Sequence, residues 1–149
     1  MQFHPLVLMG RAAILMSAIL GSTTIVRAET EAASGAAKVP PDTIIVPLMN
    51  QALTGIDGKE GTMLTVEYAP GASTAKHRHN AHTFVYVLQG SIVMQVAGGK
   101  TVTLKPGQTF YEAPSDIHAV SKNASNTQPA KFLVFMVKNK GAPPVVPVE

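Results

Sequence analysis

The feature that most constrains the fold is a series of short segments rich in β-branched and aromatic residues, separated by Gly and Pro turns. About eight such segments follow one another between Thr43 and Lys138, at a spacing of roughly 8–12 residues. No part of this region has a helical period with capping residues. The pattern predicts one all-β domain, built as an antiparallel sandwich or a small barrel.

Some individual elements can be predicted within this region. The first strand is expected at Thr43–Val46, with Pro47 at an edge or a strand end, and a loop at residues 50–61. The segment 131–137 is apolar on both faces, so we expect it to be buried between layers. The large apolar residues expected to fill or line the interior are Met63, Met94, Met136, Phe84, Phe110, Phe132, Phe135 and Tyr86.

Residues 1–28 have the form of a secretory signal peptide. An apolar run at residues 12–26 follows Arg11, and Ala28 supplies a small residue at a possible cleavage site. The run is shorter than the span of about 20 residues that a membrane helix needs. We expect export to a bacterial periplasm, cleavage after Ala28 and no stable membrane insertion afterwards. An uncleaved N-terminal anchor is the alternative. The chain has no cysteine, which excludes disulfides and a lipoprotein attachment.

The rest of the chain divides into three parts. Residues 29–42 are expected to form a flexible leader, residues 43–138 the barrel, and residues 139–149 an extended Pro-rich tail that lies across an edge or a partner subunit. Residues 29–149 carry ten Lys or Arg and nine Asp or Glu, a net charge of +1 with no basic cluster. Nucleic-acid binding normally needs a concentrated basic stripe, so we expect no nucleic-acid partner.

Three of the five histidines lie within six residues, at His77, His79 and His82. On a strand, His77 and His79 would share one face while Lys76 and Arg78 point to the other. Neutral imidazole is the commonest protein metal ligand, and this arrangement keeps the cations away from a bound metal. The alternative is that the histidines form only a solvated polar face.

Two motifs extend this pattern: Gly71-x5-His77-x-His79-x3-Thr83-x6-Gly90 and Pro106-Gly107-x6-Pro114-x3-His118-x4-Asn123. They resemble the two conserved motifs of the cupin superfamily. The resemblance implies an antiparallel double-stranded β-helix, also called a jelly-roll or cupin barrel. It also implies that His77, His79 and His118 converge on one divalent metal.

The departure from the family pattern is Thr83, which stands where the family usually has a glutamate ligand. Water and Glu112 are the preferred replacements, and Glu112 lies on the segment that leads to His118. His82 is the least favoured, because one step along a strand turns a side chain to the opposite face. A barrel whose incomplete motif binds no metal is a further alternative.

The functional expectation follows from the resemblance. The metal would be Mn, Fe, Zn, Ni or Cu, since three imidazoles suit several of these ions. The protein would act on a small organic molecule in a dioxygenase-like or isomerase-like reaction. A non-catalytic module that binds a small molecule or metal is the alternative, and a structural or storage barrel is a third. A homodimer is possible, because dimers are common in the family.

Overall fold

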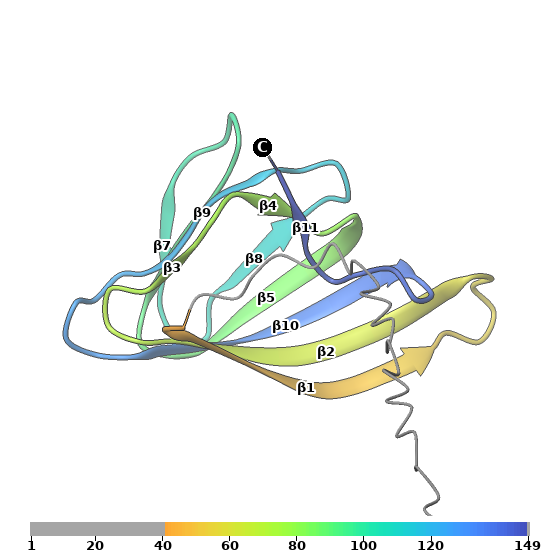
Figure 1. Cartoon of the computed structure of the whole chain (residues 1–149), viewed down its shortest axis with the longest axis horizontal. Helices are drawn as coiled ribbons and strands as arrows, with labels where there is room; N and C mark the ends of the chain where they lie inside the picture. The colour runs from red at the N-terminus through yellow and green to blue at the C-terminus, as the bar shows by residue number, and fades with distance from the viewer. Residues whose placement is uncertain (1–40, 149) are drawn as a thin grey trace, which may run out of the picture. The chain divides into compact units, whose positions relative to one another are not determined.

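The computed structural model describes residues 41–148, which form two antiparallel β-sheets (Figure 1). The predicted signal peptide and nearly all of the predicted leader lie outside the described residues. The strands are β1 (Thr43–Ala52), β2 (Lys59–Tyr68), β3 (Ser73–Thr74), β4 (His77–Arg78), β5 (Ala81–Gln89), β6 (Ile92–Val96), β7 (Val102–Leu104), β8 (Thr109–Glu112), β9 (His118–Asn123), β10 (Ala130–Asn139) and β11 (Val146–Pro147). Residues 41–148 contain no helix that could cross a membrane.

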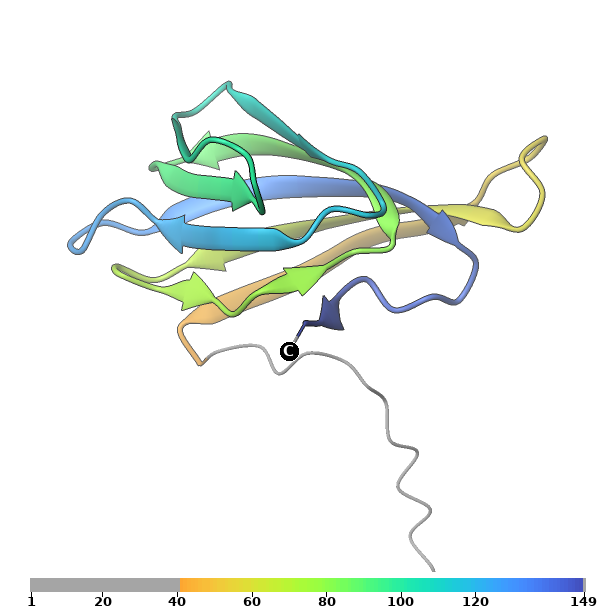
Figure 2. The ribbon, with the colours of Figure 1, turned by 90° about the horizontal axis from the view of Figure 1, so that it is seen from above.

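The two sheets face each other as the walls of a barrel. The first sheet has the order β1-β2-β10-β5-β8, and the second has the order β11-β4-β9-β6-β7, with β3 also paired to β9. Every pairing is antiparallel, and neighbours such as β2 and β10 are far apart in sequence. Figure 2 shows the two layers from above, with the C-terminal part of the chain returning beside the second sheet. The predicted all-β jelly-roll barrel is confirmed.

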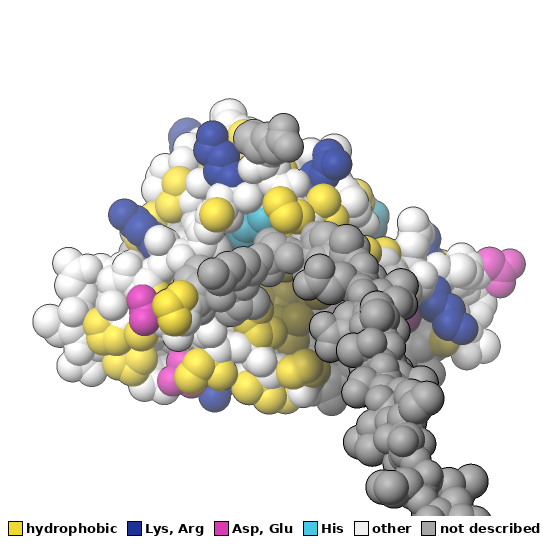
Figure 3. All heavy atoms as spheres, in the orientation of Figure 1, with side chains coloured by type: hydrophobic (Ala, Val, Ile, Leu, Met, Phe, Trp, Pro, Cys, Tyr) yellow, Lys and Arg dark blue, Asp and Glu magenta, His cyan; other side chains and the backbone are white. Residues whose placement is uncertain are grey.

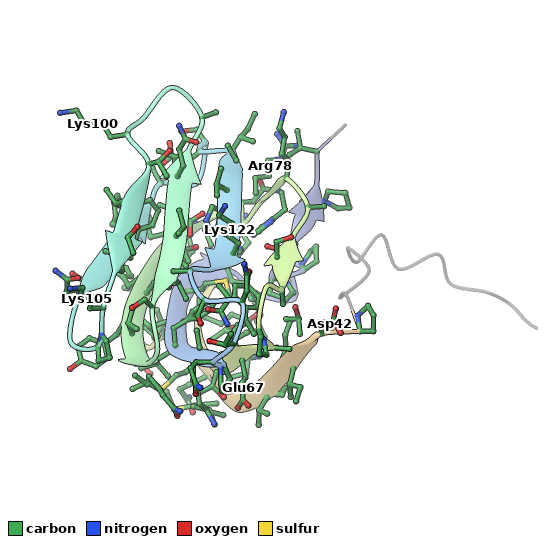
Figure 4. The ribbon with its side chains drawn as sticks, turned by 90° about the vertical axis from the view of Figure 1, so that its left-hand side faces the viewer. Asp42, Glu67, Arg78, Lys100, Lys105 and Lys122 are labelled. Carbon is green, nitrogen blue, oxygen red and sulfur yellow. The ribbon has the colours of Figure 1, made fainter. Side chains whose placement is uncertain are left out.

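The barrel interior is filled by the inward-facing residues of alternating strands. Along β5 and β10, buried residues alternate with more exposed ones, as a strand with one buried face requires. The largest buried apolar side chains come from both sheets: Tyr68, Ile92, Met94 and Met136. Charged side chains such as Lys100, Lys105 and Asp42 lie at the periphery (Figure 4).

The first strand is longer than its predicted extent of Thr43–Val46. β1 continues to Ala52, and its register shifts between Pro47 and Met49 as it pairs with β2. The predicted loop at residues 50–61 is therefore too long, because only residues 53–58 connect the two strands. β1 is the edge strand of its sheet. Edge strands tolerate proline, which has no N–H to donate to a neighbouring strand.

Part of the predicted core is wrong. Phe84 and Tyr86 are nearly half exposed on the outer face of β5, beside the exposed Tyr111 of β8. β10 buries only its inner face fully, whereas Leu133 and Phe135 on the outer face are half-buried. A continuous apolar run does not reveal which residues face inward, so the expectation that Phe84 and Tyr86 belong to the interior is wrong.

The turn after β5 depends on Gly90. Its φ of +69° lies in the left-handed region, where side chains other than glycine are strained. A Cβ atom at this position would lie 2.4 Å from the carbonyl oxygen of Pro129. Gly90 therefore allows β5 to turn while the chain that enters β10 passes against it.

A buried ion pair holds the start of the C-terminal segment, which we define as residues 141–148. The Lys138 ammonium pairs with the Glu60 carboxylate and also donates to the carbonyl oxygen of Ala142, at 2.7 Å. Glu60 accepts a second hydrogen bond from the Gly141 N–H, at 3.1 Å. Both charged side chains are about 5% exposed. The pair thus fixes the direction in which the chain leaves β10.

This ion pair predicts a pH dependence of stability. The hydrogen bond from Lys138 lowers the pKa of Glu60 below its ordinary 4.5. A lowered folded-state pKa stabilises the fold above the ordinary pKa, and the contribution is lost as pH falls through the folded-state value. Glu60→Gln should therefore lower the free energy of unfolding more at pH 7 than at about pH 3.5, which lies below the ordinary pKa. Urea denaturation at both pH values measures the difference.

The control for this prediction is Glu67→Gln, which removes an exposed ion pair with Lys131 at 3.6 Å. Exposed pairs contribute about 0–1 kcal/mol, so this variant should stay close to the wild-type protein. An equal effect of Glu60→Gln at both pH values would contradict the prediction.

Candidate metal centre

The first two histidines of the cluster come from a very short strand and the turn after it. β4 contains only His77 and Arg78, and His79 follows it directly. His77 and His79 are buried, whereas Lys76 and Arg78 are exposed, so the strand alternation places the cations on the opposite face as predicted. Asn80 then has a φ of +47°, a conformation that asparagine tolerates better than most residues, and the chain turns there into β5.

His118 is brought to the other two histidines by strand pairing. It begins β9, where its Cα is the register partner of His77. One nitrogen from each of the three side chains lies within 4.8 Å of the others. The ring centroids of His77 are 4.8 Å from those of His79 and 4.9 Å from those of His118. The predicted trio is thus assembled in one buried cluster.

Backbone carbonyls orient two of these rings. His77 Nδ1 lies 2.8 Å from the carbonyl oxygen of Ala75, and His79 Nδ1 lies 2.7 Å from that of Pro144. A carbonyl oxygen only accepts, so each Nδ1 carries the proton and each Nε2 keeps its lone pair. This is the arrangement by which metal-binding histidines are usually held.

The carboxylate of Glu112 lies beside the cluster. Its Oε2 is 3.1 Å from His118 Nδ1 and 3.6 Å from His79 Nε2, and the side chain is only 2% exposed. Glu112 is on β8, and its register partner on β5 is Thr83, which is fully buried. The motif has threonine on β5 where the family usually has glutamate, and a carboxylate reaches the cluster from the neighbouring strand β8 instead.

Burial favours the neutral forms of His77 and His79, whereas the carboxylate of Glu112 stays ionised. Burial lowers the pKa of His77 to about 4 and also lowers the pKa of His79. Burial alone would raise the pKa of Glu112, but its close contact with His118 and the nearby His79 and His77 bring that pKa below its ordinary value. Neutral imidazoles and an ionised carboxylate are the states that bind a metal.

His82 lies outside this cluster. Its side chain is exposed on the outer face of β5, and its Nδ1 is 2.7 Å from the Tyr111 hydroxyl. β5 has no bulge at this point, so the side chains of His82 and the inward-facing Thr83 point to opposite faces of the strand. His82 is therefore not placed to contact a metal held by the trio.

The residues present fit a divalent metal. Within residues 41–148, both side-chain nitrogens of His118 and both carboxylate oxygens of Glu112 are buried without a hydrogen-bond partner. Buried polar atoms are nearly always paired, and a bound ion is one of the few explanations for such exceptions. Three imidazoles and a carboxylate form a donor set that suits several transition metals. The three histidines form the geometric cluster, and Glu112 contacts two of them.

A cavity of about 340 Å³ opens beside the cluster, between the inner faces of the two sheets. Figure 3 shows histidine side chains at this opening, surrounded by hydrophobic ones. The C-terminal segment forms part of the cavity wall through Pro144, Val145 and Val148, while β11 pairs with β4 beside His77. The tail expected to lie across an edge thus extends the second sheet at the edge strand that carries His77.

The fold and the cluster can be compared with known proteins. The family model described as a cupin domain matches residues 64–136, the stretch that contains β5, β8 and all three clustered histidines. The chain belongs to the cupin superfamily. No curated protein matches it.

Several solved structures share the fold at low sequence identity. A double-stranded β-helix protein from Klebsiella pneumoniae has 15% identity and a TM-score of 0.58, with 76% of this chain and 92% of that chain covered. An oxalate oxidase in complex with glycolate has 23% identity and a TM-score of 0.56, with coverage of 74% and 58%. The cupin domain of a transcriptional regulator from Enterobacter cloacae has 23% identity and a TM-score of 0.50, with coverage of 64% and 95%.

Sequence reasoning missed two contributions to the site. The carbonyl oxygen of Pro144 holds His79 from 65 residues away, and a backbone acceptor leaves no mark in a sequence. The hydroxyls of Tyr68, Thr74 and Ser121 line the cavity, and the Tyr68 hydroxyl contacts the other two. Tyr68 and Thr74 lie in segments with strand patterns, but their inward direction could be assigned only with the register of the whole sheet.

Proposed function

We propose that this cupin binds one divalent transition metal through His77, His79, His118 and Glu112, and that it acts there on a small organic molecule. The observation that carries the proposal is the buried cluster of three histidines with an ionised carboxylate at its side, open to a cavity. A buried carboxylate with an unpartnered oxygen is costly unless something compensates it, and a cation would do so.

The residues of the chain have distinct parts in this proposal. His77 and His79 present Nε2, because their Nδ1 protons are held by backbone carbonyls. Glu112 supplies one negative charge, which leaves part of the charge of a divalent ion uncompensated. A metal held in this way supplies Lewis acidity or reactivity toward O₂. The walls of the cavity exclude water and orient the small molecule.

The first experiment measures bound metal in the protein purified without an affinity tag. We expect about one equivalent of one transition metal by elemental analysis, and its loss in the His77→Ala/His118→Ala variant. His82→Ala is the matched control, because this exposed histidine lies on the same strand region but outside the cluster. Absence of metal in all three proteins, even after reconstitution, would contradict the proposal.

A second candidate is a non-catalytic module that binds a small molecule or a metal. The similarity to the cupin domain of a transcriptional regulator supports this candidate at the level of the fold. Turnover of catechols, flavonols and keto acids by metal-loaded protein separates the two. Product formation that is lost in a folded His79→Ala variant would favour the enzyme, and binding without turnover would favour the module.

Export and homodimerisation are also proposals. Export is supported by the signal-peptide pattern of residues 1–28, which lie outside the described part of the chain. Homodimerisation is supported by the family resemblance.

A further inference from the structure

The cavity has one polar end and a long apolar wall. The wall is made of aliphatic, aromatic and thioether side chains from both sheets and the C-terminal segment, among them Leu64, Val85, Met94, Phe132, Val134 and Val145. Most of these side chains are buried, and they face the interior on strands whose alternate residues point outward. Apart from the metal centre, the cavity therefore offers chiefly apolar contacts.

Charged groups are confined to the metal centre and the rim. Among the described residues that line the cavity, the titratable side chains are the three histidines, Glu112, Tyr68 and Lys76. Lys76 is exposed, and neighbouring Arg78 points away from the interior (Figure 4). The buried Lys138 is already paired with Glu60 and does not line the cavity. Apart from Lys76 at the rim, a charge on the body of a bound molecule would thus find no charged partner in the described wall beyond the metal centre.

The uncharged polar groups of the wall are hydroxyls. Tyr68 Oη bonds to Ser121 at 2.7 Å and contacts Thr74 at 3.2 Å, so these three groups largely satisfy one another. Thr83 Oγ1 is fully buried and has no partner within residues 41–148. Its register partner is Glu112, so this hydroxyl is available near the metal centre to a polar atom of a bound molecule.

From this arrangement we infer that the site takes a small molecule with an oxygen donor at one end and an uncharged, largely apolar body. The inference rests on the proposed metal site, whose histidines would meet the oxygen end. Moving a charged group from water into an apolar wall without a partner is strongly unfavourable, whereas an apolar group gains free energy on burial. A volume of about 340 Å³ lies at the lower end of ligand pockets, so the molecule is small.

The test uses three catechols that share the same metal-binding diol and differ only in the body. They are 4-methylcatechol, 3,4-dihydroxybenzoate, which carries a carboxylate, and 4-(2-aminoethyl)catechol, which carries an ammonium group. Binding is measured by calorimetry without oxygen, on zinc-loaded and on metal-free protein. We expect 4-methylcatechol to bind zinc-loaded protein at least about tenfold more tightly than either charged compound.

Ile45→Lys and Val46→Lys supply a matched pair of variants. Ile45 lines the cavity from the edge strand β1, and Val46, the next residue, is exposed on the opposite face. Ile45→Lys should strengthen binding of 3,4-dihydroxybenzoate and reduce the preference for the neutral compound. Val46→Lys should leave the order of the three compounds unchanged. Both positions are already partly exposed, so an added lysine is compatible with folding.

The outcomes separate this inference from the metal proposal. If zinc strengthens the binding of none of the three compounds, the proposed metal site is contradicted. The preference for a neutral body is then measured by binding to the metal-free protein. Equal or tighter binding of a charged catechol would overturn the inference. Failure of 4-methylcatechol to bind either form would overturn it as well.

Discussion

Glu112→Gln is expected to weaken divalent-metal binding by about tenfold or more. The substitution keeps the size of the side chain and one carbonyl oxygen, but removes the negative charge 3.1 Å from His118 and 3.6 Å from His79. Loss of a partner that only supports a metal ligand already costs about 10–100-fold in affinity, and a ligating carboxylate should cost at least as much. Competition with a chromogenic chelator measures the dissociation constant.

A rescue variant tests whether the position of the carboxylate matters or only its presence. Thr83 and Glu112 are register partners on neighbouring strands. Adding Thr83→Glu to Glu112→Gln returns a carboxylate from the strand that normally carries it in the family, and should recover most of the lost affinity. Glu67→Gln, which changes an exposed carboxylate, should have no effect on metal affinity. An unchanged dissociation constant in Glu112→Gln would assign Glu112 a structural role.

Removal of residues 144–149 is expected to weaken metal binding by about 10–100-fold. The truncation removes the carbonyl oxygen that fixes the His79 ring at 2.7 Å and the β11 strand that pairs with β4 beside His77. It leaves Ala142 in place, so the hydrogen bond from Lys138 and the ion pair with Glu60 remain. The same chelator competition measures the change, and urea denaturation shows whether the barrel stays folded.

Pro144→Ala is the control for this truncation. It changes the side chain but keeps the backbone carbonyl that accepts from His79, so metal affinity should stay within about twofold of the wild type. Equal metal affinity in the truncated and full-length proteins would show that the C-terminal segment does not help to hold the site.

The histidine trio could be predicted from the sequence because its geometry is mostly local. His77 and His79 share a face through strand alternation alone, and the motif spacing identified His118. The sequence alone could name Glu112 as a candidate ligand but could not place it beside the histidines, since its position depends on the register between β5 and β8. Sequence reasoning placed Glu112 among three candidates, and the structure puts its carboxylate beside the cluster and His82 on the outer face.

The errors also have physical causes. Phe84 and Tyr86 belong to a run in which both faces are apolar, so period-two alternation could not separate the inner residues from the outer ones. The sequence underestimates the length of β1 because Pro47 is typical of a strand end, and the polar residues Asn50 and Gln51 are typical of a loop. An edge strand with an irregular register tolerates both.

The distribution of the site over the two sheets has a consequence for the whole barrel. Glu112 belongs to the first sheet, whereas the three histidines are held by β4, β9 and the turn after β4 in the second sheet. A metal bound by all four residues would join the two sheets with a cross-link, in a chain that has no cysteine to form one. Because such binding stabilises only the folded state, the resistance of this barrel to heat would depend on the supply of free metal around it.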